Sequence, residues 1–293
     1  MSGMITVFRK ELADHFTSWR FLILFILVFG VGVYAIYVDA QYIRQAVTET
    51  RFVFLQLYTT SGQAQPLFLF FIVFFMPIVG LVLGFDAINS EKNSGTLSRL
   101  LSQPIYRDTV INGKFLAGIV TIAIMLTSIV LLVAGMGLSM IGVPPSSEEA
   151  IRLLVFLVVS IVYGGFWLGL AILFSVFFSR VATSALASIA IWIFFIFMFA
   201  FPLFVQQGQF GLMVMQVSPI TLFWEVITLL LVPGARTMGQ ILQGGVGGVP
   251  TSALPLGQSL LSVWPHLVGL IMLMVVCFAI SYIKFMREEI RST

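Results

Sequence analysis

Charged side chains are scarce in this sequence. Of its 293 residues, 9% are charged and 59% are hydrophobic, and the mean hydropathy is +1.08. Soluble domains carry about 25% charged residues, because their surfaces must be hydrated. The composition therefore excludes a soluble domain, and we expect a polytopic membrane protein.

Cysteine and histidine are also nearly absent. The one cysteine, Cys277, lies in an apolar run, which excludes an intrachain disulfide and a cysteine-based metal cluster. The two histidines, His15 and His266, are expected on opposite sides of the membrane, so they cannot share a metal ion. The net charge of +3 and the pI near 9.2 are too small to indicate nucleic-acid binding. We expect neither a metal site nor a nucleic-acid partner.

Catalytic motifs are missing as well. The sequence has no His-Glu-x-x-His motif and no membrane-embedded pair of carboxylates. Its Gly113-Lys114 pair is not a Walker A motif, because Asp108 stands where the leading glycine should be. We therefore expect no enzyme active site and no cofactor bound by this chain.

What the sequence does have is long runs without Asp, Glu, Lys or Arg. A transmembrane helix needs about 20 apolar residues, and a charge at its centre costs about 2.5–3.5 kcal/mol. The runs predict an all-α integral membrane protein with six spans: Phe21–Val38, Pro66–Phe85, Phe115–Val143, Leu153–Phe178, Val181–Val205 and Leu267–Ile283. A secondary carrier driven by an ion gradient is disfavoured, because it would need ionisable groups near the membrane midplane.

The distribution of positive charge predicts the orientation. Six spans place both termini on one side, and that side holds eleven of the 15 lysines and arginines. Positive charge accumulates in cytoplasmic segments. Both termini are therefore expected in the cytoplasm, and the expected location is the cytoplasmic membrane of a prokaryotic cell.

The segment before the first span resembles an amphipathic helix over residues 1–20. Ile5, Phe8, Leu12 and Phe16 recur at near-helical spacing. The expected interface residues are Phe8, Arg9, Lys10, Glu11 and Leu12. This helix either only anchors the first span on the cytoplasmic leaflet or also forms part of a docking surface for a cytosolic partner.

A polar insert, residues 86–114, separates the second and third spans. Asn93 or Ser94 can cap a helix whose first turns run from Gly95 to Leu101 and which ends before Pro104, a residue that lacks an N–H. Its apolar face holds Leu97, Leu100 and Leu101. Each buried leucine contributes about 1.5–3 kcal/mol, enough for a docking contact, although resting on lipid headgroups is an equal alternative.

The segment between the fifth and sixth spans, residues 206–262, is expected on the outer side. Pro219–Pro233 encloses about 13 apolar residues, too short to span and typical of an interfacial or re-entrant helix. Its lone carboxylate, Glu225, either faces water or acts as a gate or substrate contact. The Gly/Pro-rich stretch Gly244–Gly257 is expected to be a loop.

Two kinds of close spacing leave alternatives open. Gly80–Gly84 and Gly165–Gly169 are small-xxx-small pairs, which either bring helices together within the chain or mark a dimer seam. Met136 and Met140, one helical turn apart, are better explained by packing than by copper relay.

The polar insert resembles the signature of type-2 ATP-binding-cassette (ABC) exporter permeases. The residues that carry the resemblance are Glu91, Gly95, Thr96, Leu97, Leu100, Leu101, Pro104, Ile105 and Arg107, followed by Gly113 and Lys114. The six spans, the Arg9-Lys10-Glu11 stretch and the basic tail fit the same family. The arrangement is most similar to permeases of nitrous-oxide reductase maturation and of drug or peptide export.

The resemblance implies a single permease domain over residues 1–293 whose insert is a coupling helix. In that family the coupling helix contacts a cytosolic ATPase subunit, which binds ATP and Mg²⁺. Two permease copies, here expected to be a homodimer, assemble with two ATPases. An alternative is a membrane scaffold that uses ATPase motion without moving a solute.

Overall fold

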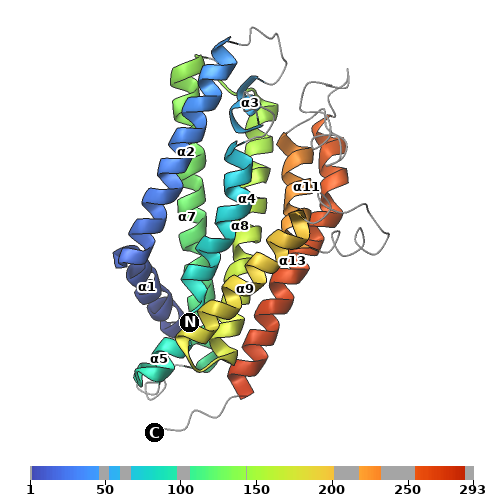
Figure 1. The fold of residues 1–293 in the computed structure, drawn as a ribbon. Coiled ribbons are helices and arrows are strands. Elements are labelled where there is room, and N and C mark those ends of the chain that lie inside the picture. The colour runs from blue at the N-terminus through green and yellow to red at the C-terminus, as the bar shows by residue number, and fades with distance from the viewer. Residues whose placement is uncertain are drawn as a thin grey trace.

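The protein is helical throughout the residues that the structure describes. This computed structural model describes residues 2–45, 53–59, 67–97, 106–142, 144–200, 218–231 and 255–287. Its helices are α1 (Ser2–Thr17), α2 (Trp19–Gln45), α3 (Val53–Thr59), α4 (Leu67–Gly84), α5 (Asn89–Asn93), α7 (Arg107–Ile141), α8 (Ser147–Phe177), α9 (Val181–Ala200), α11 (Pro219–Leu231) and α13 (Leu256–Arg287). The expected all-α fold is confirmed in these ranges (Figure 1).

Six segments are long and apolar enough to cross a membrane, as expected. They are built on α2, α4, α7, α8, α9 and α13. The 35 residues of α7 make it about 52 Å long, whereas the hydrocarbon core of a bilayer is about 30 Å thick. The helix starts at Arg107, eight residues before the expected span, so its first turns project beyond the apolar layer and bring Lys114 to the polar insert.

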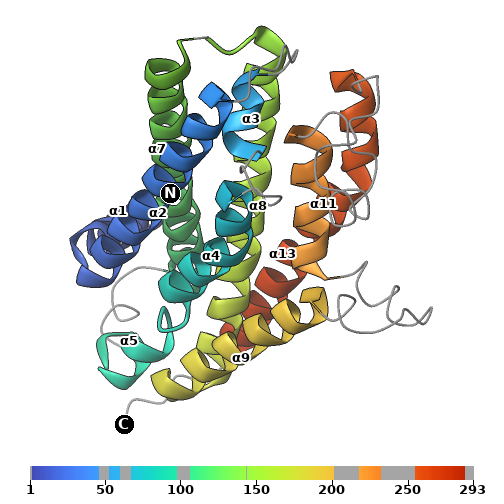
Figure 2. The ribbon, with the colours of Figure 1, turned by 45° about the horizontal axis from the view of Figure 1, so that its top comes forward.

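The centre of the bundle is α8. It packs against α4 on one side and α13 on another, and it also contacts α7, α9 and α11. Figures 1 and 2 show α4 and α8 side by side, with α2 and α7 to one side of them and α9 and α13 to the other. The helices α1 and α5 and the C-terminal end of α13 lie at the same end of the bundle (Figure 1).

The two small-xxx-small pairs bring helices together within the chain. A Cβ added at Gly80 would lie 2.8 Å from the Gly164 carbonyl oxygen, and one at Gly84 would lie 2.9 Å from the Leu168 carbonyl oxygen. These contacts let α4 approach the backbone of α8. A Cβ at Gly165 would similarly meet Met274 Sδ of α13 at 2.8 Å. Of the two alternatives, the structure therefore supports packing within the chain.

The sixth span differs from its expected bounds. It was expected to begin at Leu267 after an outer loop, but α13 begins at Leu256 and continues through Pro265. Proline is tolerated in membrane helices when neighbouring groups satisfy the backbone. Ser259, fully buried in the first turns of α13, bonds Arg152 of α8 and fixes this extension to the bundle. Residues 256–262 therefore belong to the helix, not to the loop.

The expected short helix in the outer segment is α11. Ten of its 13 residues are buried, because it lies among α4, α8, α9 and α13. Phe223 stacks on Tyr163 of α8 with ring centroids 4.0 Å apart, and Trp224 packs on Phe70 of α4 at 4.6 Å. This helix is an internal element of the bundle.

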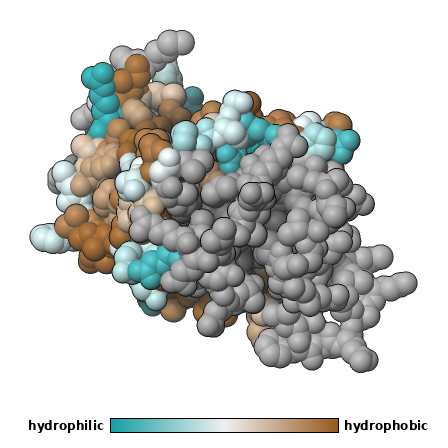
Figure 3. All heavy atoms as spheres, turned by 90° about the horizontal axis from the view of Figure 1, so that it is seen from above, coloured by the Kyte–Doolittle hydropathy of each residue, from teal (hydrophilic) through white to brown (hydrophobic). Residues whose placement is uncertain are grey.

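The outer helices present apolar side chains to their surroundings. Only 11% of the span windows of α9 and α13 is buried, and large side chains such as Leu186, Phe197 and Met272 are more than half exposed. Seen from above, hydrophobic side chains reach the outer edge of the described part (Figure 3). Such a surface suits a lipid environment, where apolar groups need no burial within the chain.

Candidate functional site

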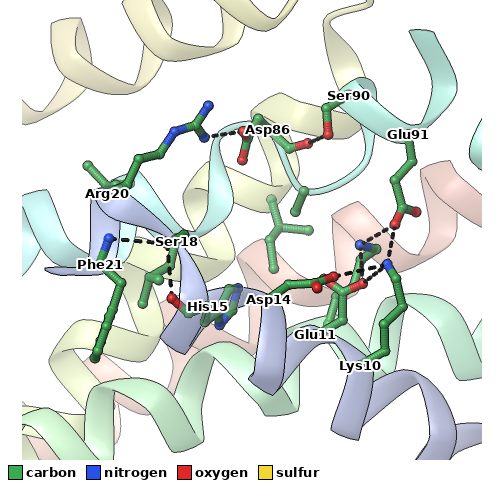
Figure 4. Close-up of a pocket in the computed structure, with 15 residues that line it drawn as sticks. Lys10, Glu11, Asp14, His15, Ser18, Arg20, Phe21, Asp86, Ser90 and Glu91 are labelled. Atoms are coloured by element: carbon green, nitrogen blue, oxygen red, sulfur yellow. Dashed lines mark hydrogen bonds and ion pairs between the residues drawn. The ribbon is translucent and has the colours of Figure 1, made fainter. Parts of the chain in front are cut away.

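Four charged side chains from three helices meet at the end of the bundle that holds α5. Lys114 Nζ of α7 lies 2.8 Å from Glu11 Oε1 of α1 and 3.0 Å from Glu91 Oε1 of α5. Lys10 Nζ lies 2.9 Å and 3.2 Å from the same two oxygens. We call Lys10, Glu11, Glu91 and Lys114 the four-charge cluster (Figure 4). It ties the N-terminal helix to the polar insert and to the third span.

The cluster is largely shielded from solvent. The side chains of Lys114, Glu11 and Glu91 are 5%, 10% and 13% exposed. Among the described residues Glu91 Oε2 is buried without a hydrogen-bond partner. Replacing one of these three side chains leaves an uncompensated buried charge, which costs about 3–5 kcal/mol, whereas Lys10 is 47% exposed.

Neighbouring charges keep Lys10 and Glu11, the two members of the cluster that belong to α1, ionised. Burial raises the pKa of Glu11, but the charge and hydrogen bond of Lys114, followed by those of Lys10, outweigh it, so the pKa lies below its ordinary value of 4.5. Burial lowers the pKa of Lys10, but the hydrogen bonds and charges of Glu11 and Glu91 outweigh it and raise the pKa above 10.5. Both groups are therefore ionised near neutral pH.

A cavity of about 240 Å³ adjoins the cluster. Its rim includes Arg20 of α2, which pairs with Asp86 and lies over the Phe85 ring. Its lining also includes His15, whose Nδ1 is 3.0 Å from Thr121 Oγ1 of α7. Burial is the main reason that the pKa of His15 lies below 6.5. A second set of polar contacts thus joins α1 and α2 to the same region.

The N-terminal helix turns one face to the bundle and another outward. Val7 is 2% exposed and packs on Gly113 of α7, where an added Cβ would lie 2.9 Å from Val7 Cγ1. Ile5 and Phe16, on the opposite face, are 50% and 41% exposed. Of the expected interface residues, Lys10 and Glu11 join the cluster, Phe8 and Leu12 are half-buried, and Arg9 is exposed.

The polar insert begins differently from the sequence-based expectation. A five-residue helix, α5, ends at Asn93, and Gly95 follows in the left-handed conformation with φ +70°. The expected helix therefore cannot begin at Gly95, because a left-handed residue lies outside helical geometry. Helical geometry resumes at Thr96, whose hydroxyl donates to the Glu91 carbonyl at 3.2 Å.

The remaining residues of the expected coupling helix have different outcomes. Leu97 is 2% exposed and belongs to the hydrophobic core, and its expected role in coupling stays a prediction. Arg107 begins α7. Leu100, Leu101 and Pro104 lie outside the described residues, and the helix that they were expected to form stays a prediction.

Serine side chains that sequence reasoning did not single out fix the insert to the bundle. Ser175 Oγ of α8 accepts hydrogen bonds from the backbone N–H groups of Ile88 and Asn89 at 2.9 and 3.1 Å. Ser184 Oγ of α9 donates to the Phe85 carbonyl at 2.7 Å. A serine in an apolar run carries no local signal for such a role. The insert is thereby attached to α8 and α9 as well as to α1 and α7.

At the opposite end of the bundle, polar side chains attach the short helices. Glu149 of α8 completes the capping box of its own helix. Its carboxylate also accepts hydrogen bonds from the backbone N–H groups of Phe54 and Leu55 at the start of α3. Glu225 Oε2 of α11 lies 2.7 Å from His266 Nε2 of α13, and both side chains are about one-third exposed. The sequence indicated Glu225 but not its histidine partner.

Comparison with known proteins agrees with this architecture. The family model described as "ABC-2 family transporter protein" matches residues 5–290. The chain is also 29% identical over 197 residues to the "Probable ABC transporter permease protein NosY" of Pseudomonas aeruginosa. The aligned stretch covers 66% of this chain and 67% of that protein. The match to the family model spans all six candidate membrane helices and both polar ends of the bundle. The chain belongs to the ABC-2 transporter family, as a permease of the ABC-2 type.

Proposed function

We propose that this chain is the membrane subunit of an ABC exporter, driven by ATP hydrolysis on a separate cytosolic subunit. That partner binds ATP and Mg²⁺ and docks on the polar insert. Two copies of this chain, with two ATPase subunits, form the transporter. Membership of the ABC-2 family supports the ATPase partner.

The observation that carries the proposal is the four-charge cluster. Glu91 lies four residues before the left-handed Gly95, in the short helix near the start of the insert. Lys114 and Lys10 hold its carboxylate, so a push on the insert acts on α7 and α1 at once. Because α1 leads into α2 through a single residue, Ser18, the push reaches the first span too.

The proposed orientation places this end of the bundle in the cytoplasm. The helices α1 and α5 and the C-terminal end of α13 lie together there, and the sequence assigns eleven of its 15 lysines and arginines to this side. The same arrangement follows from the positive-inside rule, which concerns short segments near the ends of spans.

The test uses the full chain, affinity-tagged and purified from its source membranes into lipid nanodiscs. We expect a soluble subunit with a Walker A motif to co-purify and to hydrolyse MgATP. Lys114→Met should lower that hydrolysis at least fivefold. In this variant Glu11 and Glu91 retain one cation of the cluster, the more exposed Lys10, as their ion-pair partner. Lys284→Met, at an exposed lysine over the Phe177 ring, is the matched control and should have little effect.

Two results would contradict the proposal. The first is a purified chain that carries no ATPase subunit yet still transports a solute in liposomes. The second is coupled hydrolysis that never moves a solute outward in reconstituted vesicles, which would favour a membrane scaffold.

A further inference from the structure

A polar stripe runs along α11 on the side that faces α13. Ser218, Thr221, Glu225 and Thr228 follow one another at spacings of three, four and three residues, which places them on one helical face. Figures 1 and 2 both show α11 beside α13. An ionisable side chain in an apolar bundle, here Glu225, points to a functional surface.

The hydroxyl groups of the stripe lack partners. Ser218, Thr221 and Thr228 are 1–3% exposed, and in the described part of the chain their oxygens form no hydrogen bond. Other hydroxyls in the bundle donate to a carbonyl one turn back, as Thr121 does to Ala117 at 2.8 Å and Ser160 to Phe156 at 2.8 Å. Of the five buried unpartnered hydroxyls among the described residues, two therefore lie on α11 and a third, that of Ser218, directly precedes it.

Buried polar groups without partners are rare in native structures, because each costs about 1–3 kcal/mol. Three on one helical face indicate a surface that binds a polar group in another state of the protein. Glu225 gives this surface its charge, and His266 of α13 holds the carboxylate at 2.7 Å.

We propose that this stripe is a binding site for the ammonium group of an amphipathic amine. The carboxylate of Glu225 would pair with the ammonium, and the hydroxyl of Thr221, one helical turn before it on the same face, would accept one of its remaining hydrogen bonds. The apolar part of the ligand would contact an aromatic group formed by Trp224, Phe70 and Phe199. The ring centroid of Trp224 lies 4.6 Å from that of Phe70 and 5.9 Å from that of Phe199. His266 occupies the carboxylate when the ligand is absent.

This inference rests on the proposed function, since it names the chemical class of the cargo. It makes an asymmetric prediction for the two partners of the pair. Loss of Glu225 removes the site, whereas loss of His266 removes its competitor. A pair that only stabilised the fold would respond alike to either loss.

The test measures binding of hexylamine, which is protonated at neutral pH, to the full chain in lipid nanodiscs without any ATPase. Hexanol and hexanoate are the matched probes. The sequence has two histidines, so ¹⁵N-histidine labelling gives ring signals that a His15→Gln variant assigns. We expect hexylamine to shift the His266 signals and to leave those of His15 unchanged.

The variants separate a binding site from a structural pair. Glu225→Gln, which keeps the size and a hydrogen bond, should weaken hexylamine binding at least tenfold, and Thr221→Val should weaken it severalfold. His266→Asn should strengthen it. Asp108→Asn, at the other end of the bundle, is the charge control and should leave the affinity unchanged.

Equal effects of the three probes, or equal binding by the parent chain and Glu225→Gln, would overturn the inference. Weaker binding in His266→Asn would do so too. None of these results bears on whether an ATPase drives the protein, because no nucleotide takes part in the measurement.

Discussion

Val7 of α1 lies directly against Gly113 of α7, which has no side chain to keep the two helices apart. Lys114, which follows Gly113 in α7, forms an ion pair with Glu11 of α1, with Nζ 2.8 Å from Oε1. Two adjacent residues of α7 therefore dock α1, one by its small size and the other by its charge. Gly113 and Lys114 were singled out in the sequence for their likeness to the permease signature, and the structure gives both residues a physical role.

A larger residue at position 113 should undock α1. A Cβ there would lie 2.9 Å from Val7 Cγ1 and 3.5 Å from the backbone nitrogen of Phe8. Overpacking of this kind costs about 1–3 kcal/mol. We expect Gly113→Val to expose the N-terminal helix to limited proteolysis in nanodiscs.

The same variant has two controls. Val7→Ala in the Gly113→Val background should restore much of the protection, because it removes the clashing atoms. Gly135→Val, further along α7, meets nothing within 4 Å of an added Cβ and should not change the cleavage. Failure of the Val7→Ala rescue would mean that the clash is not with α1.

Gly95 should tolerate asparagine but not leucine. An L-residue in the left-handed conformation costs about 1–2 kcal/mol, and asparagine adopts it more readily than others. No atom lies within 4 Å of an added Cβ at Gly95, so the cost is one of backbone conformation alone. Gly95→Leu should reduce ATPase coupling roughly tenfold, as measured by hydrolysis in the purified complex, while membrane insertion stays normal.

A matched control for Gly95 lies at the opposite end of the protein. Gly142 has φ +77° and equally open surroundings after α7. Gly142→Leu carries the same backbone cost and should leave coupling intact. Similar losses in both leucine variants would attribute the effect to general destabilisation.

Sequence reasoning found the spans because charge is excluded from the apolar layer, and the six charge-free runs correspond to six helices. It misplaced their ends because helices continue past that layer when tertiary contacts support them. Ser259 bonds Arg152 and thereby holds an extension of α13 that the sequence assigned to a loop.

Residues of the candidate site were recognised singly but not as one group. Lys10 and Glu91 are 81 positions apart, and no periodicity links positions so distant. His15, Ser175 and His266 were missed as partners because a lone histidine or serine in an apolar context gives no local signal. Glu225 was noticed because a carboxylate between Trp224 and Val226 is costly unless it has a role.

Stability at the α1 end should fall as the pH decreases below about 6.5. Burial depresses the pKa of His15 in the folded chain, so the unfolded chain binds a proton more readily. The stabilisation is present above the ordinary value of 6.5 and is lost as the pH falls toward the folded value. Each unit by which the pKa of His15 differs between the folded and the unfolded chain changes the free energy of unfolding by about 1.4 kcal/mol.

Thermal unfolding in nanodiscs between about pH 7.5 and pH 5.5 tests this. In a His266→Gln background, where His15 is the remaining histidine of the sequence, the midpoint should fall with pH, and adding His15→Gln should make the fall smaller. Glu11 does not interfere, because its lowered pKa confines its own effect to pH values below 4.5. An unchanged slope in His15→Gln would show that another group carries the pH dependence.

Arg152 should be the most sensitive charged position at the end of the bundle opposite α5. It is fully buried, and its Nη1 donates to the Leu230 carbonyl at 2.8 Å and to Ser259 Oγ at 3.2 Å. Its Nη2 pairs with Glu148 at 2.9 Å. A planar guanidinium can serve α8, α11 and α13 at once, whereas a lysine ammonium lacks the fork geometry.

We therefore expect Arg152→Lys to lower the free energy of unfolding by about 1–3 kcal/mol and Arg152→Met by about 3–5 kcal/mol. Glu148→Gln, which keeps an acceptor for the guanidinium on a partly exposed side chain, should cost much less. Denaturant unfolding of the three variants in one lipid environment gives the comparison. If Arg152→Met were as stable as the parent chain, the attachment of α11 would have to come from its aromatic contacts with Tyr163 and Phe70 instead.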